Sequence, residues 1–218
     1  AKVVMASLCL EKSDIYELIE YKEKFSRVIP SIFLPTTHGT ASEVTMWGTV
    51  WDMTKKKKYS ISHPDLYPTI AILDGNLTLT LPLDISIMTV LDALSHSFES
   101  IWNKNKNPIS ANYAIEAISL ILKNSEDLKQ NSLNLEVRNN LLIAANKAGL
   151  AFSNTKTAAA HSISYPLTMH YGITHGIAAS LSLPWLLEIN KLEIEKELNS
   201  IYNGLNLRGF SELKQVLF

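Results

Sequence analysis

Residues 85–101 read ISIMTVLDALSHSFESI, and their apolar side chains recur at the spacing of an amphipathic helix. A helix places residues four apart on one face, so Asp92 and His96 would present a carboxylate and an imidazole side by side. Such a pair can share one metal ion. Taken alone, an Asp/His pair on a helix is more often a structural contact, so a metal site needs further ligands from elsewhere in the chain.

Further helices are predicted after this stretch, and no strand pattern returns after Pro82. The periodic segments are residues 110–123, 136–152, 158–171, 175–190 and 194–205. Two of these segments contain the histidines His161 and His175. Together with Asp92 and His96 they would provide three imidazoles and one carboxylate. This donor set suits Zn²⁺ or Fe²⁺, with a position left for a substrate oxygen.

The residues before Pro82 mix helix and strand signals. Two helices are expected within residues 2–25, and strands are expected at residues 31–34, 43–51 and 69–73. The run of four lysines at residues 55–58 is interpreted as a hairpin tip. The change to an all-helical pattern predicts a domain boundary near Leu81-Pro82, with an α/β domain at residues 1–81 and an all-α domain at residues 82–218.

The composition argues against several classes of protein. The 218 residues carry 20 Lys+Arg and 21 Asp+Glu, a net charge of −1, which argues against nucleic acid or an anionic membrane surface as the main partner. No apolar run reaches the ~18–20 residues of a membrane span. The single cysteine, Cys9, excludes an internal disulfide and fits a reducing compartment, so we expect a cytoplasmic protein.

Four motifs occur in an order that resembles the iron-containing (group III) alcohol dehydrogenases. They are PTTHGTASE at residues 35–43, Asp92 to His96 with Glu99, His161-Ser162, and His175-Gly176. The resemblance implies a dehydroquinate synthase-like architecture, in which a Rossmann-like cofactor domain precedes an all-helical metal domain. The family's glycine-rich phosphate loop would end on Ala1-Lys2, so we expect the chain to be truncated at its N-terminus.

The resemblance also implies the residues of two sites. The metal site, for Fe²⁺ or Zn²⁺, would consist of Asp92, His96, His161 and His175. The NAD(P) site would include Thr36, Thr37, Thr40 and Ser42, with Lys58 near the nicotinamide ribose. Outside this context the hydroxyl residues would read as an ordinary strand-to-turn segment, and Lys58 as a solvated charge.

The chain differs from the family at a position that could transfer a proton to the substrate. The family often has a second histidine four residues after its second histidine ligand, and this chain has Tyr165 there. We expect Tyr165 or His170, which lies between two ligands in the sequence, to exchange the proton with the product alkoxide. Alternatively Tyr165 packs with the following proline, and His170 is a substrate contact or a spectator.

Residues 154–168, NTKTAAAHSISYPLT, are most similar to the phosphonoacetaldehyde reductase branch of the family. Within this segment Lys156 lies five residues before His161 and would bind a phosphonate dianion through charge-assisted hydrogen bonds. The alternative is that Lys156 is a solvated residue at the start of a helix.

The sequence therefore predicts a metal-dependent oxidoreductase that transfers hydride between NAD(P)H and a small aldehyde, with phosphonoacetaldehyde as the sharper hypothesis. A generic short-chain alcohol or polyol dehydrogenase of the same family is the first alternative. A catalytically inactive helical metal-binding fragment is the second, because the phosphate loop is missing. The resemblance implies a homo-oligomer that acts on a small molecule, without nucleic-acid or membrane partners.

Overall fold

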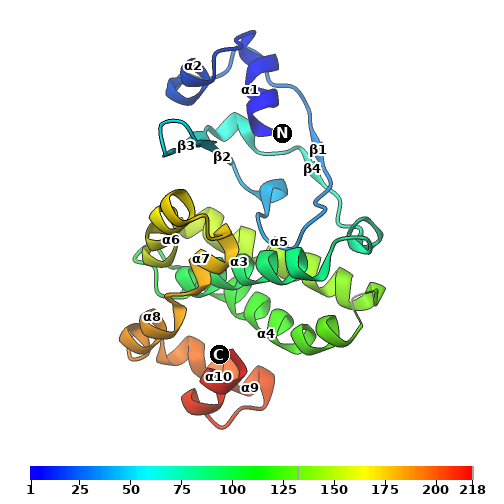
Figure 1. The fold of residues 1–218 in the computed structure, drawn as a ribbon, viewed down its shortest axis with the longest axis vertical. Helices are drawn as coiled ribbons and strands as arrows, with labels where there is room; N and C mark the ends of the chain where they lie inside the picture. The colour runs from blue at the N-terminus through cyan, green and yellow to red at the C-terminus, as the bar shows by residue number, and fades with distance from the viewer. Residues whose placement is uncertain (132, 218) are drawn as a thin grey trace. The chain divides into compact units, whose positions relative to one another are not determined.

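The computed structural model describes residues 1–131 and 133–217 (Figure 1). Internal contacts divide the chain into two compact units. Unit 1 comprises Ala1–Leu34 and Ser42–Ile72, and unit 2 comprises Pro35–Ala41 and the described residues from Leu73 onward. This division does not coincide with the predicted boundary at Leu81-Pro82, since residues 73–81 pack with the helices of unit 2.

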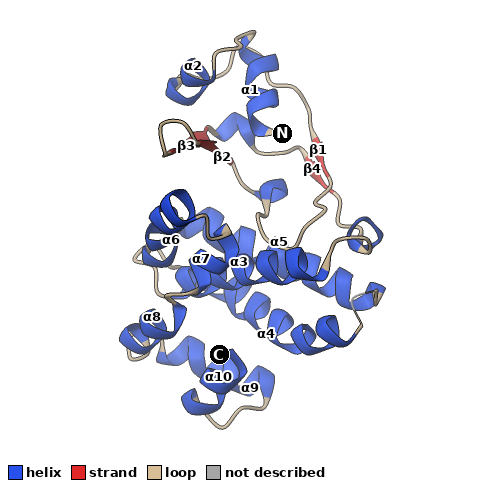
Figure 2. Ribbon diagram, viewed as in Figure 1, coloured by secondary structure: helices blue, strands red, loops and turns tan. Residues whose placement is uncertain are grey.

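Unit 1 combines two helices with two small sheets, and the strands of the described chain all lie in it (Figure 2). Its elements are α1 (Lys2–Leu10), α2 (Ile15–Glu20), β1 (Ile32–Phe33), η1 (Ser42–Val44), β2 (Trp47–Asp52), β3 (Lys57–Ser62), η2 (Pro64–Leu66) and β4 (Ile70–Ala71). Strands β1 and β4 pair in parallel, and β2 and β3 form an antiparallel hairpin in which Trp47 lies opposite Ser62. The prediction that the lysine run forms a hairpin tip is therefore confirmed, although the second strand of this hairpin was not among the predicted strands and already includes Lys57 and Lys58.

A buried cation connects the parts of unit 1. Lys2 is buried at the start of α1, and its ammonium group donates hydrogen bonds to the carbonyl oxygens of Thr45 and Leu66. Burial lowers the pKa of Lys2 to about 8, against the opposing effect of the Glu43 carboxylate. The small core around it consists of Met5, Ala6, Cys9, Leu18, Phe25, Ile61 and Leu66.

Unit 2 is a helical bundle. Its elements are η3 (Gly75–Thr78), α3 (Leu83–Ile101), α4 (Pro108–Gln130), α5 (Leu135–Thr155), α6 (Ala159–Tyr171), α7 (His175–Ser180), α8 (Leu183–Asn190), α9 (Glu195–Leu205) and α10 (Phe210–Leu217). Helices α3, α4 and α5 pack on one another through buried alanines, whose small side chains permit close approach (Figure 1). The predicted α/β segment followed by an all-helical region is therefore confirmed.

The helices differ from the sequence-based expectation at several points. Helix α4 continues to Gln130, past the predicted end at residue 123. The predicted helix at residues 175–190 is divided into α7 and α8, because Pro184 lacks an N–H group and occupies the first turn of α8. Helix α10 was not predicted.

None of the helices in the described part of the chain combines the length and the apolar character of a membrane-spanning segment.

The segment that precedes α3 is attached to α5. Arg138 is fully buried, and its guanidinium donates to Ser86 Oγ at 2.5 Å and to the carbonyl oxygen of Leu81 at 3.1 Å. The neighbouring Asn139 accepts a hydrogen bond from the backbone N–H of Gly75 at 2.8 Å. These contacts explain why residues 73–81 belong to the helical unit.

The turn at residues 35–41 also packs on α3. The backbone N–H of His38 donates to Thr89 Oγ1 at 3.3 Å, and a Cβ at Gly39 would lie only 2.8 Å from the carbonyl oxygen of Thr89. Glycine is therefore required for this close approach. The His38 imidazole is fully buried, and both of its ring nitrogens lack a hydrogen-bond partner within the described residues.

This buried histidine predicts a pH dependence of stability. Burial, together with the positive charge of Arg138, lowers the pKa of His38 from 6.5 to about 4. Because His38 binds a proton more readily in the unfolded chain than in the folded chain, protonation favours unfolding. The contribution of His38 to the free energy of unfolding is therefore highest above pH 6.5 and falls as the pH is lowered towards 4, by up to ~1.4 kcal/mol per pH unit.

The free energy of unfolding, measured with urea between pH 4 and 7, should depend less steeply on pH in His38→Gln than in the wild type. The exposed His170→Gln is the matched control and is expected to keep the wild-type slope. If the free energy of unfolding had the same slope against pH in the wild type and in His38→Gln, the lowered pKa of His38 would be contradicted.

Candidate metal centre

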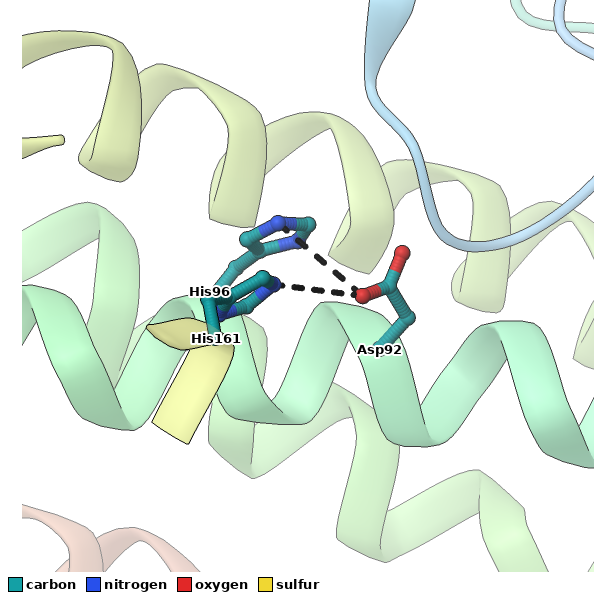
Figure 3. Close-up of side chains that lie close together, drawn as sticks. All are labelled: Asp92, His96 and His161. Carbon is teal, nitrogen blue, oxygen red and sulfur yellow. Dashed lines mark ion pairs between the residues drawn. The ribbon is translucent and has the colours of Figure 1, made fainter. Parts of the chain in front are cut away.

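Three predicted ligands converge in unit 2 (Figure 3). Helix α3 carries Asp92 and His96 one turn apart, and α6 brings His161 against them. Asp92 Oδ1 lies 3.4 Å from His161 Nε2 and 4.0 Å from His96 Nε2. All three side chains are buried, and one ligand atom from each lies within 4.8 Å of the others. This is the clustering that a shared ion requires.

The polar atoms of this cluster are poorly satisfied without an ion. Asp92 Oδ1 and His161 Nε2 are buried and make no hydrogen bond within the described part of the chain. Buried polar atoms are nearly always partnered, so two opposed orphan atoms need an explanation. A carboxylate oxygen and imidazole nitrogens are ligands that Zn²⁺ and Fe²⁺ accept. The residues therefore fit a divalent ion.

His175 approaches the same point at the start of α7. Its Nε2 lies 3.8 Å from Asp92 Oδ1, and its ring centroid lies 5.5 Å from that of His161. The following Gly176 permits this approach, because any side chain there would collide with the carbonyl oxygen of Met88 on α3. His175 is the most exposed of the four predicted ligands, and its role as a ligand stays a prediction.

Ring stacking fixes the orientation of His96. Its ring lies between those of Phe152 and His161, with centroid distances of 4.1 and 4.3 Å and interplanar angles of 17° in both cases. Rotation of the imidazole would disrupt both contacts. The stack therefore keeps His96 directed along the face of α3 that carries Asp92.

Glu99 is a further buried member of the site. Its carboxylate is fully buried, and Oε2 lies 2.5 Å from His161 Nδ1. Its other oxygen accepts a hydrogen bond from the backbone N–H of His161 at 3.2 Å. The sequence motif contains Glu99, but sequence reasoning assigned it no role, because its partner lies 62 positions away.

The electrostatics of the cluster favour a carboxylate surrounded by imidazoles. Burial alone would raise the pKa of Asp92, but its interactions with the neighbouring imidazoles of His96, His161 and His175 lower it well below its usual range. Burial lowers the pKa of His96 to about 3, so that ring is neutral. Burial also opposes protonation of His161, yet the carboxylates of Asp92 and Glu99 outweigh it and raise the pKa to about 9.

The predicted cofactor residues are divided between the two units. Thr36, Thr37 and Thr40 lie in the turn of unit 2 that packs on α3, and Thr36 and Thr40 are exposed. In unit 1, Ser42 begins η1 and Lys58 pairs with Trp51 in the β2–β3 hairpin. Their participation in one NAD(P) site stays a prediction.

The two candidates for the proton route lie on opposite faces of α6. Tyr165 lies one turn after His161. Its ring is nearly parallel to that of His175, with a centroid distance of 6.1 Å and an interplanar angle of 13°. His170 lies nine positions after His161, which is half a turn out of phase in an α-helix, and it is exposed. The helix therefore directs Tyr165, rather than His170, towards the clustered ligands.

The predicted substrate residue Lys156 is exposed in the connection between α5 and α6. Its backbone has φ 66° and ψ 175°, a conformation that glycine normally occupies. Its carbonyl oxygen accepts a hydrogen bond from Asn103 Nδ2 at 3.2 Å. The side chain's role in substrate binding stays a prediction.

Models of known families match both parts of the chain. The model described as Fe-containing alcohol dehydrogenase family, C-terminal, matches residues 86–216, and the model described as iron-containing alcohol dehydrogenase matches residues 1–75. The chain belongs to the iron-containing alcohol dehydrogenase family.

Curated relatives and solved structures of this family have different names. The probable alcohol dehydrogenase EutG of Escherichia coli K12 is 32% identical over 180 residues, which are 83% of this chain and 46% of the relative. The phosphonoacetaldehyde reductase of Streptomyces viridochromogenes is 31% identical over 159 residues, 73% of this chain and 40% of the relative. A sulfoacetaldehyde reductase from Bifidobacterium kashiwanohense, solved with NAD⁺, superimposes with a TM-score of 0.89 at 32% identity, covering 99% of this chain and 57% of that structure.

The chain thus spans about half the length of the curated relatives it matches. The nearly equal identities favour no single branch of the family, so the predicted similarity to the phosphonoacetaldehyde reductase branch is not distinguished from similarity to the others.

The clustered ligands predict that the chain binds about one divalent ion. We expect His161→Ala to weaken binding by at least ~100-fold, because it removes a buried donor and its contact with Glu99. Metal content after loading with Zn²⁺, or with Fe²⁺ under anaerobic conditions, is measured by inductively coupled plasma mass spectrometry. His170→Ala, on the opposite face of α6, should keep the wild-type content. An ion-free wild type, or equal loading of His161→Ala, would contradict the site.

Proposed function

We propose that the chain is the metal-binding part of an NAD(P)-dependent dehydrogenase that interconverts small aldehydes and alcohols. The observation that carries the proposal is the buried convergence of Asp92, His96 and His161, with unsatisfied atoms of Asp92 and His161 facing one another. Family membership supports it, as does similarity to a reductase solved with NAD⁺. Residues 1–81 are proposed to contribute to the cofactor domain.

The proposed role of the clustered residues is to hold a cation beside the substrate oxygen, on which negative charge develops during the reaction. An ion bound by Asp92, His96 and His161, with His175 as the fourth ligand, would supply Lewis-acid polarisation, and NAD(P)H would supply the hydride. Asp92 stays ionised and His96 stays neutral in the folded chain, so both offer lone pairs to a cation. The stacked ring of Phe152 covers His96 and restricts water on that side.

Tyr165 is proposed to exchange the proton with the substrate oxygen. A phenol is both donor and acceptor, and Tyr165 lies on the face of α6 that carries His161, beside the exposed edge of the site formed by His175. His170 remains the alternative, but a substrate at the cluster would have to reach around α6 to contact it.

The two proton candidates can be separated by kinetics. Because general acid catalysis contributes ~10²–10⁴-fold, Tyr165→Phe is expected to lower kcat by at least ~100-fold, whereas His170→Ala should stay near the wild-type rate. Both variants are assayed with NADH and NADPH in the longest reading frame that contains the chain, after metal content is shown to be unchanged. A normal rate for Tyr165→Phe would remove it from the mechanism.

We further propose that the substrate is an aldehyde with an anionic acid group, phosphonoacetaldehyde being the first to test. Lys156 lies in the connection that leads into α6, five residues before His161, and its exposed ammonium group is available to an anion. Two proteins similar to this chain have names that describe such substrates, a phosphonate and a sulfonate. An uncharged alcohol is the alternative, supported by the similarity to EutG.

Lys156→Gln tests this specificity. We expect kcat/KM for phosphonoacetaldehyde to fall ~10–100-fold while that for acetaldehyde changes less than about twofold, since only the former carries the anion. Lys123→Gln, an exposed lysine on α4, is the matched control. Equal losses for both aldehydes would contradict anion binding by Lys156. Metal binding without nucleotide binding or turnover would instead favour an inactive metal-binding fragment.

A further inference from the structure

We propose that Glu99 is a positioning residue that fixes the orientation and tautomer of His161 while it holds the first turn of α6. This inference rests on the metal site of the proposed function. It goes beyond the ligand set, because it assigns a separate task to a side chain that has no place among the ligands.

Glu99 lies on the face of α3 that carries two of the metal-ligand candidates. Glu99 lies seven positions after Asp92 and three after His96, and these spacings place all three on one side of the helix. Asp92 and His96 contribute to the cluster itself. Glu99, further along the helix, is fully buried and lies on the far side of the His161 ring from Asp92, since it contacts Nδ1 whereas Asp92 is close to Nε2.

The contact with Glu99 determines the tautomer of His161. An ionised carboxylate only accepts hydrogen bonds, so the 2.5 Å contact between Glu99 Oε2 and His161 Nδ1 requires the proton on Nδ1. A histidine that binds a metal ion is a neutral imidazole with one N–H group, so with the proton on Nδ1 the ligating lone pair is on Nε2. Nε2 is the atom that lies 3.4 Å from Asp92 Oδ1 without a hydrogen bond. Carboxylate partners of this kind commonly orient metal-binding histidines.

Glu99 also contacts the start of α6. The residue at its N-cap position, Ala158, has no side chain that accepts a hydrogen bond. Glu99 Oε1 instead accepts from the backbone N–H of His161, the third residue of the helix, which is the donor that an N-cap side chain normally satisfies. One carboxylate from α3 therefore caps α6 and orients the ring that α6 carries.

The residues that follow Glu99 hold the preceding connection. Asn103 Nδ2 donates to the carbonyl oxygen of Lys156 at 3.2 Å, and Asn105 Nδ2 donates to that of Thr155 at 3.2 Å. These bonds anchor the connection in which Lys156 has its unusual backbone conformation. They act on the backbone only, so they provide a comparison for the effect of Glu99 on the ring.

The experiment uses zinc-loaded chain labelled with ¹⁵N-histidine. Long-range ¹H–¹⁵N spectra, with His161→Gln for assignment, report which ring nitrogen of His161 binds zinc and which carries a proton. The wild type should show zinc on Nε2 and a downfield Nδ1–H resonance. Zinc on Nδ1 of the wild type would overturn the proposal, whatever the folding of any variant.

Glu99→Gln keeps an acceptor for the helix start but removes the charge that holds Nδ1–H. We expect it to lower zinc affinity ~10–100-fold in competition titrations and to lose the downfield resonance. Asn103→Ala, the matched control, loosens the connection and should keep the resonance. Unchanged affinity and an unchanged His161 spectrum in Glu99→Gln would overturn the inference. A wild type that binds no zinc would instead refute the proposed metal site.

Discussion

The buried carboxylate of Asp92 is the constraint on which the helical unit depends. A carboxylate taken out of water is strongly unfavourable unless charges or ligands compensate it. Here the compensation comes from imidazoles on α3, α6 and α7, which requires the first turns of α6 and α7 to meet the middle of α3. Electrostatics therefore contributes to the packing around this point, together with apolar burial.

Two groups of helices bring the imidazoles to Asp92. Helices α3, α4 and α5 form the alanine-rich core that holds Asp92 and His96 in place. Helices α6 and α7 are shorter, and their first turns carry His161 and His175. Glu99 of α3 accepts a hydrogen bond from the first turn of α6, and Gly176 in the first turn of α7 permits close approach to α3, which explains how each turn is held close to that helix.

Periodicity predicted most of the helical frame, because helical spacing is a local property. Ligand type and the order of the four motifs, rather than periodicity, predicted that Asp92, His96 and His161 share one site. Periodicity missed β3, whose lysine-rich start hides the strand alternation, and α10 near the end of the described chain. The division between α7 and α8 was also missed, although Pro184 is a visible signal for it.

The parts of the site that depend on distant partners were not predictable in the same way. The contact of Glu99 with His161 joins residues far apart in the sequence, and the burial of His38 results from packing of its turn on α3. By contrast, the outward position of His170 follows from its spacing to His161 on one helix and was available from the sequence.

The most direct test of the metal centre is an anomalous difference map from crystals of the zinc-loaded chain, recorded at the zinc absorption edge. We predict a single strong peak about 2.0–2.2 Å from the ligand atoms of Asp92, His96 and His161. A map without that peak, or with zinc bound only at surface side chains while the three buried residues remain unliganded, would contradict it.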